Sequence, residues 1–283
     1  MNQTSKKLWI QLAHITALFS SLFILLLSNP TLATETEQWT KSVETNTETV
    51  NHNAWQLILD AYLIEDSKSG INLFKYHAVS KQDKTKLATY LDQLQAIDPL
   101  KKTKAEQKAY WINLYNALTV KLILDHYPTK SITKLGESIF SFGPWGDEIV
   151  TVNGEELSLN DIEHKILRPI FKDARIHYAV NCASYSCPNL SNKAYTSINT
   201  DKLLNEGHCD YVNHPRGVSF DGRSLTLSSI YDWYAEDFGN SKEDLVKHLL
   251  HCAQGNLKGK LETFLASDDD IDYDYNWNLN EIK

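Results

Sequence analysis

Cys182 and Cys187 lie five residues apart in the stretch NCASYSCPNL, a spacing that allows either a reactive thiol or a disulfide. A thiol close to an imidazole can act as a nucleophile, because the ring takes up the thiol proton and stabilises the thiolate. The same two cysteines could instead form a disulfide, which would close a short loop and remove the nucleophile. Both interpretations remain open at this point.

His164 is the first candidate for the base that would activate Cys182, and Glu163 beside it could orient or charge-stabilise the imidazole. Neighbouring residues of a helix point about 100° apart, so these two side chains cannot both face one atom. His177 is the second-choice base. It lies five residues before the cysteine, and on a straight strand the two side chains would face opposite sides.

The expected position of His164 depends on a short helix that is followed by a strand. The helix should begin at Asn160-Asp161, and residues 175–180 (RIHYAV) are β-prone and predict a buried strand. A strand rises about 3.3 Å per residue and a helix only about 1.5 Å, so the strand can run back along the whole helix. An antiparallel return would bring Cys182 beside His164.

Helical patterns dominate the first half of the chain. Helices are expected over residues 54–63, 84–97 and 103–127. Thr103 and Glu106 form a capping box at the start of the third helix, whose aromatic and aliphatic face should make it the spine of the core. Asn113 and Asn116 lie on this helix, and we expect these supporting polar residues to hydrogen-bond loop backbone.

Two segments of the second half match each other at an offset of 68 residues, namely 150–162 (VTVNGEELSLNDI) and 218–230 (VSFDGRSLTLSSI). Each predicts a β-hairpin, around Asn153-Gly154 and Asp221-Gly222, followed by a helix. We interpret them as one module used twice, although chance convergence on a common turn would look similar. The predicted fold class is α+β, with a helical majority packed around a small, largely antiparallel sheet.

Cys209 and Cys252 lie on further predicted helices, over residues 201–212 and 241–253. An even number of cysteines in an oxidising compartment first suggests disulfides. These two could pair with each other or remain as buried thiols. Four cysteines allow three pairings, and the sequence does not choose among them.

Residues 1–33 have the three parts of a cleavable secretory signal: Lys6 and Lys7, an apolar run of 13 residues over 15–27, and the small residues of Thr31-Leu32-Ala33. The run is shorter than the span of about 20 residues that crosses a membrane, although an uncleaved anchor is the alternative. We therefore expect a periplasmic or secreted protein. Residues 34–51 are polar and predict a flexible leader, and 52–283 should form a single domain.

The composition of the chain excludes some classes of binding partner. The net charge of −8 argues against nucleic acid, and no segment after the signal is apolar enough for stable membrane insertion. The sequence contains no phosphate-cradling glycine loop, no Gly-x-Ser-x-Gly elbow and no zinc-binding helix motif. We expect no cofactor and no metal, and a peptide or amide as the substrate.

Several motifs in order resemble the domain-of-unknown-function 547 family: YWINLYNALT (110–119), LSLNDIEHKILR (157–168) and RIHYAVNCASYSCPNL (175–190). The closing YNWNLN (275–280) is similar to the Tyr-Asp-Trp-x-Leu-Asn ending of the family, with Asn276 in place of the Asp. The resemblance covers most of the chain from about Trp55 onward.

The resemblance implies roles for particular residues. The Ile-Glu-His and Cys-x-Ser motifs of the family fall on Ile162-Glu163-His164 and Cys182-x-Ser184, which favours His164 over His177. The second cysteine is a serine in related proteins, which argues against an obligatory Cys182–Cys187 bridge. The set of Glu, His and Cys is similar to papain-like and transglutaminase-like thiol enzymes in permuted order, by analogy of geometry rather than of motif.

The sequence thus predicts an exported thiol hydrolase or acyltransferase that acts on peptide or amide bonds. Cys182 would be the nucleophile, His164 the base and Glu163 its support. The alternative is a non-catalytic, disulfide-stapled extracytoplasmic binding module. The number of free thiols in the unreduced protein distinguishes the two.

Overall fold

The computed structural model describes residues 36–66, 68–136 and 143–282. The chain divides into two compact units, Met1–Gln38 and Trp39–Lys283. Nearly all of the first unit, including the expected signal peptide, lies outside the described residues. The elements below belong to the second unit.

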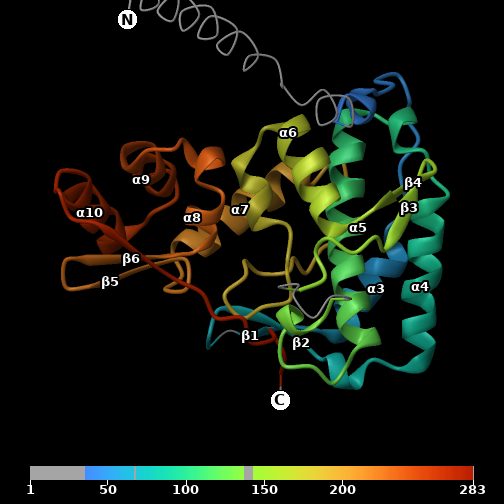
Figure 1. The fold of residues 1–283 in the computed structure, drawn as a ribbon, viewed down its shortest axis with the longest axis horizontal. Helices are drawn as coiled ribbons and strands as arrows, with labels where there is room; N and C mark the ends of the chain where they lie inside the picture. The colour runs from blue at the N-terminus through green and yellow to red at the C-terminus, as the bar shows by residue number, and fades with distance from the viewer. Residues whose placement is uncertain (1–35, 67, 137–142, 283) are drawn as a thin grey trace, which may run out of the picture. The chain divides into compact units, whose positions relative to one another are not determined.

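The three helices expected in the first half are confirmed as α3 (Asn53–Tyr62), α4 (Lys81–Gln95) and α5 (Lys104–Asp125) (Figure 1). Thr103 caps α5, because its hydroxyl accepts a hydrogen bond from the Glu106 N–H. The other half of the predicted capping box is absent. The Glu106 carboxylate instead accepts the Val50 N–H at 2.7 Å.

Helix α5 is the spine of the core. Of its 22 residues, 16 are buried, and they include polar residues. A helix that is buried all round must give its polar side chains partners inside the protein. Asn113 and Asn116 find them in loop backbone, as expected from the sequence. Asn113 pairs with both polar backbone groups of Tyr195, at 2.7 and 2.9 Å.

Asn116 binds the chain just before the candidate nucleophile. Its amide donates to the carbonyl of Ala179 at 2.8 Å, and its oxygen accepts the N–H of Asn181 at 2.8 Å. Both bonds are buried. One side chain of α5 therefore fixes the backbone that leads to Cys182.

The small, largely antiparallel β-structure is divided among three sheets in the described residues. Strands β1 (Leu63–Asp66) and β2 (Ile71–Phe74) pair antiparallel, as do β3 (Val150–Val152) and β4 (Glu155–Leu157). In the third sheet β5 (Val218–Asp221) pairs antiparallel with β6 (Ser224–Ser228), and β7 (Ile271–Asp274) lies parallel to β6. The fold is α+β with a helical majority.

The two matching segments both form hairpins, but their turns differ. The first turn is Asn153-Gly154, and the second is Gly222-Arg223. Both glycines have positive φ, a conformation that favours glycine. The hairpins lead into a π-helical turn, η5 (Asp161–Leu167), and a short helix, α8 (Ile230–Trp233).

The prediction of a strand over residues 175–180 is wrong. These residues begin in a 3₁₀ helix, η6 (Ala174–Tyr178), whose start is capped by the Asp173 carboxylate at the Arg175 N–H. A short buried apolar run does not by itself distinguish strand from helix, and the aspartate cap favours the helical turn. The antiparallel return that would have carried Cys182 to His164 is therefore absent.

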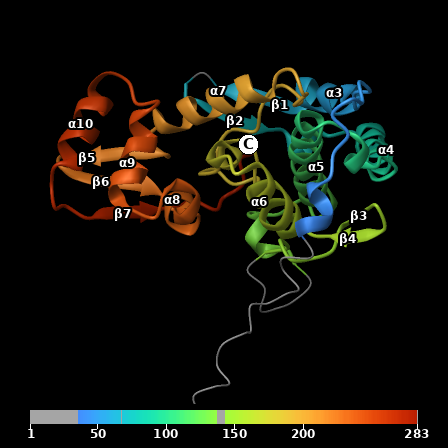
Figure 2. The ribbon, with the colours of Figure 1, turned by 90° about the horizontal axis from the view of Figure 1, so that it is seen from above.

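Later helices follow the sequence expectations more closely. Helices α7 (Thr200–Val212) and α9 (Lys242–Leu250) confirm the predictions for 201–212 and 241–253, whereas α10 (Gly255–Leu265) was not predicted. A disulfide between Cys209 and Cys252 confirms that pairing. Figures 1 and 2 show α9 and α10 beside β5 and β6, away from α3, α4 and α5. Each of these two groups has its own hydrophobic cluster.

The segment expected to be a flexible leader contains two buried apolar side chains. Trp39 is 3% exposed and lies edge-on to Trp111 of α5 with ring centroids 5.2 Å apart, and Val50 is also buried. The second compact unit begins at Trp39 and includes these residues. Among the described residues, no helix is both long and apolar enough to cross a membrane.

We expect Asn116→Ala to lower the free energy of unfolding by about 2–4 kcal/mol, because it leaves two buried backbone groups without partners. Denaturant unfolding followed by circular dichroism measures this change. Asn256→Ala, at an exposed position in α10, is the control and should change stability by no more than about 0.5 kcal/mol. Equal effects of the two variants would show that Asn116 does not stabilise the loop.

Candidate functional site

Cys182 lies on a sharp turn of a loop whose ends are buried. Ala183 has a φ of 58°, which is the left-handed region that non-glycine residues rarely adopt. Its N–H donates to the Asn181 side chain at 2.8 Å, and the Asn181 amide donates to the Pro188 carbonyl at 2.8 Å. Such backbone strain persists only where surrounding contacts hold it, and it concentrates at functional sites.

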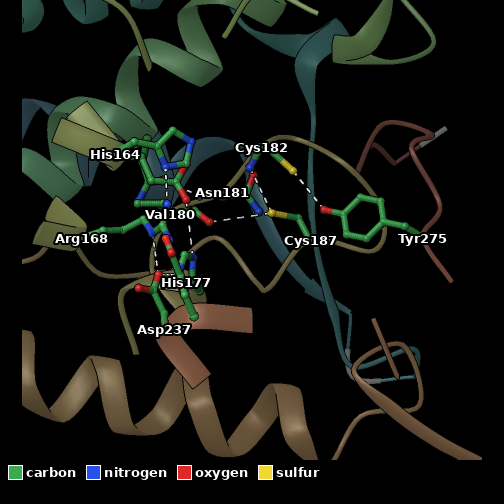
Figure 3. Close-up of polar contacts among 12 residues, drawn as sticks. His164, Arg168, His177, Val180, Asn181, Cys182, Cys187, Asp237 and Tyr275 are labelled. Carbon is green, nitrogen blue, oxygen red and sulfur yellow. Dashed lines mark hydrogen bonds and ion pairs between the residues drawn. The ribbon is translucent and has the colours of Figure 1, made fainter. Parts of the chain in front are cut away.

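Two hydroxyl groups contact the sulfur of Cys182. The Sγ atom lies 3.2 Å from the Ser184 hydroxyl and 3.1 Å from the Tyr275 hydroxyl, and the Ser184 hydroxyl donates to Tyr275 at 2.8 Å. Figure 3 shows the Tyr275 ring pointing its oxygen at the thiol. Burial raises the pKa of Cys182, but hydrogen bonds from Cys187, Ser184 and Tyr275 outweigh this effect and lower the pKa to about 7.

The end of the chain positions Tyr275. After β7, the backbone carbonyls of Asn276 and Asn278 accept the N–H groups of Ser186 and Tyr185 at 3.2 and 2.7 Å. The Asn276 N–H in turn donates to the Ser186 hydroxyl at 2.8 Å. These bonds join the last segment to the cysteine loop, and they explain how a tyrosine 93 residues away reaches the thiol.

Cys187 is a second free thiol beside the first. Neither cysteine is in a disulfide, so the bridge that would have removed the nucleophile is not formed. The Cys182 N–H donates to the sulfur of Cys187 at 3.0 Å. Cys187 is 4% exposed, whereas Cys182 is half-buried. Burial and the neighbouring thiol raise the pKa of Cys187.

A cavity of about 640 Å³ opens beside Cys182. Glu163, His177 and Cys187 also contribute to its wall. Aromatic side chains form much of the remaining lining: Tyr115, Trp145, Trp233, Tyr234, Tyr275 and Trp277. Within the described residues, no lysine or arginine lines this cavity. The cavity therefore offers flat apolar faces next to a thiol and a carboxylate.

His177 lies between two carboxylates. Its Nε2 is 2.6 Å from Asp237, and its Nδ1 is 3.5 Å from Glu163. Its ring stacks on Tyr234 with centroids 4.1 Å apart. Burial alone would lower the pKa of His177, but the two carboxylates outweigh burial and raise it, so the charged imidazolium is favoured.

Arg168 completes this charged group. Its Nε donates to Asp237 at 2.5 Å, beside the bond from His177. Burial opposes ionisation of Asp237, but these two donors lower its pKa to about 2. The pKa of Glu163 is also lowered, because the charge of His177 outweighs complete burial. Arg168 also pairs with the exposed carboxylate of Glu236, so two positive groups meet two buried or half-buried carboxylates and a third that faces solvent.

His164, the first-choice base, lies elsewhere. Its Nδ1 accepts a hydrogen bond from Arg168 at 2.9 Å, and it lines a different cavity, together with Asp173. Burial lowers the pKa of His164, and the charge of Arg168 adds to this effect. No hydrogen bond joins His164 to Cys182 in the described part of the chain. Figure 3 shows both histidines grouped around Arg168, apart from the two thiols.

The structure therefore brings together three of the residues singled out from the sequence, Cys182, Glu163 and His177. Sequence reasoning missed Tyr275, Asp237 and the aromatic wall. The YNWNLN ending was a signal for Tyr275, although nothing local connects it to the cysteine loop. No cluster of three or more metal-binding side chains occurs in the described ranges.

Because His177 is charged in the folded protein, its contribution to stability should depend on pH. Because its folded-state pKa is raised, its contribution to stability is complete below the unfolded value of about 6.5 and is lost as pH rises through the folded value. The difference in unfolding free energy between wild type and His177→Gln should therefore shrink as the pH rises above about 6.5. Urea unfolding across this range measures it.

His77→Gln is the matched control, since His77 is exposed and lies outside the cavity. Its difference from wild type should change little over the same range. A difference for His177→Gln that is constant or grows with pH would contradict the charged state assigned to His177.

Residues 99–212 match the model of a family described as protein of unknown function, DUF547. This match confirms the resemblance expected from the sequence. It includes Cys182, Glu163 and both candidate histidines, whereas Tyr275 and Asp237 lie beyond its end. No curated protein and no solved structure matches the chain.

Proposed function

We propose that this protein is an exported thiol-dependent hydrolase or acyltransferase of peptide or amide bonds, with Cys182 as its nucleophile. One observation carries the proposal: the half-buried sulfur lies at the wall of a large cavity, 3.1 Å from the Tyr275 hydroxyl, which itself accepts a hydrogen bond from Ser184. A pKa of about 7 leaves a large fraction of the thiol ionised at neutral pH. The thiolate is the reactive form.

Cys182 attacks the carbonyl carbon of the substrate, and the resulting tetrahedral intermediate collapses to a thioester as the C–N bond breaks. The amine leaves with a proton. Water then attacks the thioester and releases the acid, or a second amine attacks it and completes acyl transfer. In either case the thiolate of Cys182 is restored.

We assign the proton for the leaving amine to His177. It lines the cavity that Cys182 lines, it is held in the charged form, and its Nδ1 has only the longer contact, 3.5 Å to Glu163, while Nε2 lies 2.6 Å from Asp237. Glu163 orients the ring from one side and Asp237 from the other. His164, which the sequence favoured, is not given this role, because it bonds Arg168 at another cavity.

The cavity wall supports a peptide or amide substrate. Planar amide groups and apolar side chains pack well on aromatic faces such as those of Trp233 and Trp277, which stack with centroids 5.4 Å apart. Trp233 is 45% exposed, so its ring is available for contact. The signal-like residues 1–33 support action outside the cytoplasm.

A non-catalytic binding module is the second candidate. The aromatic cavity would serve binding alone, and the Cys209–Cys252 disulfide is typical of proteins in oxidising compartments. The unbridged thiols favour the enzyme, because a module of this kind has no use for an ionised cysteine. Covalent reactivity separates the two.

Removing the Tyr275 hydroxyl should raise the pKa of Cys182. We expect Tyr275→Phe to shift the midpoint of the pH dependence of iodoacetamide labelling from about 7 upward by about one unit, because a hydrogen bond to the thiolate is lost. Tyr273→Phe in β7, whose side chain is exposed, is the control and should leave the midpoint unchanged. An unshifted midpoint in Tyr275→Phe would remove Tyr275 from the activation of the thiol.

Catalysis is tested with a library of fluorogenic peptide amides incubated with the purified unreduced protein. We expect Cys182→Ala to abolish cleavage of any amide that the wild type cleaves, and His177→Gln to reduce the turnover number by about 100-fold or more. His164→Gln should reduce it far less. Cleavage that survives in Cys182→Ala would disprove the proposed mechanism.

A further inference from the structure

The two free thiols differ in ways that the hydrolytic reaction does not require. Cys182 is half-buried beside the cavity, whereas Cys187 is almost completely buried behind it. Hydrolysis through a thioester needs one cysteine only. A second thiol in contact with the first therefore calls for a separate explanation.

The two sulfur atoms are close neighbours. The sulfur of Cys187 accepts the N–H of Cys182 at 3.0 Å and donates to the Val180 carbonyl at 3.8 Å, so it lies against the backbone of the residue that carries the first thiol. The loop between them closes on itself, since the Cys187 N–H donates to the Ser184 carbonyl at 3.2 Å. Both cysteines lie on this one loop, five residues apart, so a disulfide between them involves the loop alone.

Arg216 supplies positive charge at the buried end of this loop. Its guanidinium donates to the Tyr185 carbonyl and to Asn189, and it packs over Tyr211. No carboxylate pairs with it in the part of the chain that the structure describes. Arg216 therefore holds the backbone between the two cysteines, at Tyr185, and the residue just after them, Asn189.

We propose that Cys182 and Cys187 form an attacking and resolving pair that undergoes thiol–disulfide exchange with small disulfides entering the cavity. One accessible and one buried thiol on a single tight loop, with the sulfur of Cys187 against the backbone of Cys182, carry this inference. It rests on the reactive Cys182 of the proposed function and gives that residue a second reaction.

The exchange proceeds in two balanced steps. The thiolate of Cys182 attacks one sulfur of the disulfide RSSR, so that a mixed disulfide forms and one RS⁻ leaves. Cys187 loses its proton and attacks the Cys182 sulfur, which forms the internal disulfide and releases the second RS⁻. The protein loses two electrons and two protons, and the small disulfide becomes two RSH molecules.

The internal disulfide masks the nucleophile. Oxidation of the pair therefore stops hydrolysis, and a reducing thiol restores it by the reverse steps. The substrate class for this second reaction is a low-molecular-weight disulfide small enough for a cavity of about 640 Å³.

The test exposes the full chain to oxidised glutathione and follows intact mass with and without a thiol-blocking reagent. Wild type should lose two hydrogens and carry little bound glutathione. Cys187→Ser should stop at the mixed disulfide, with at least about tenfold more bound glutathione than wild type, because the resolving thiol acts at a millimolar or higher effective concentration. Cys182→Ser should not react, since Cys187 is buried.

A wild type that retains glutathione like Cys187→Ser would overturn the inference, as would a wild type that does not react at all. The wild-type result alone decides the matter if a variant fails to fold. If the protein exchanges disulfides but hydrolyses no amide, the thiol-pair proposal stands and the hydrolase proposal fails. If it hydrolyses an amide but keeps glutathione bound, the hydrolase proposal stands and the thiol-pair proposal fails.

Discussion

The site depends on how a buried loop satisfies its backbone. The segment that carries Cys182 passes through the interior outside any sheet; part of its backbone pairs with the last residues of the chain, and the rest needs side-chain partners. Asn116 of α5 holds the Ala179 carbonyl and the Asn181 N–H, and the Asn181 side chain then holds the Ala183 N–H. These bonds set the turn that presents the thiol. Helix α5 therefore both forms the centre of the core and positions the loop that carries Cys182.

The second constraint is electrostatic. His177 is held by Glu163 and Asp237, and Arg168 balances the excess negative charge. Removing one member leaves an uncompensated buried charge, which costs several kcal/mol. The group therefore behaves as a unit. It provides a charged imidazolium at the cavity, whereas Cys182 is stabilised separately by Ser184 and Tyr275.

Much of the fold could be predicted, because its signals are local. Caps and apolar periodicity located α3, α4 and α5, and the turn residues located the β3–β4 and β5–β6 hairpins. Strand β7 was not predicted, because the acidic sequence around Asp272 lacks the apolar pattern of a buried strand. Its parallel pairing with β6 joins residues far apart in the chain.

The candidate site was only partly predictable for the same reason. Cys182 and Glu163 were identified from residue type and motif. The preference for His164 rested on a family motif and on an expected strand, and the strand is instead a 3₁₀ helix, so the geometric half of that argument does not hold. Tyr275 and Asp237 reach the site through tertiary contacts, which spacing along the chain cannot supply.

The central claim is that the fold makes one cysteine reactive and keeps the other covered. Brief labelling of the unreduced protein with substoichiometric iodoacetamide at neutral pH, followed by peptide mapping, tests it most directly. The account predicts that the label is found on Cys182 and that Cys187 remains unlabelled. Label on Cys187 instead, or on neither residue, would contradict it.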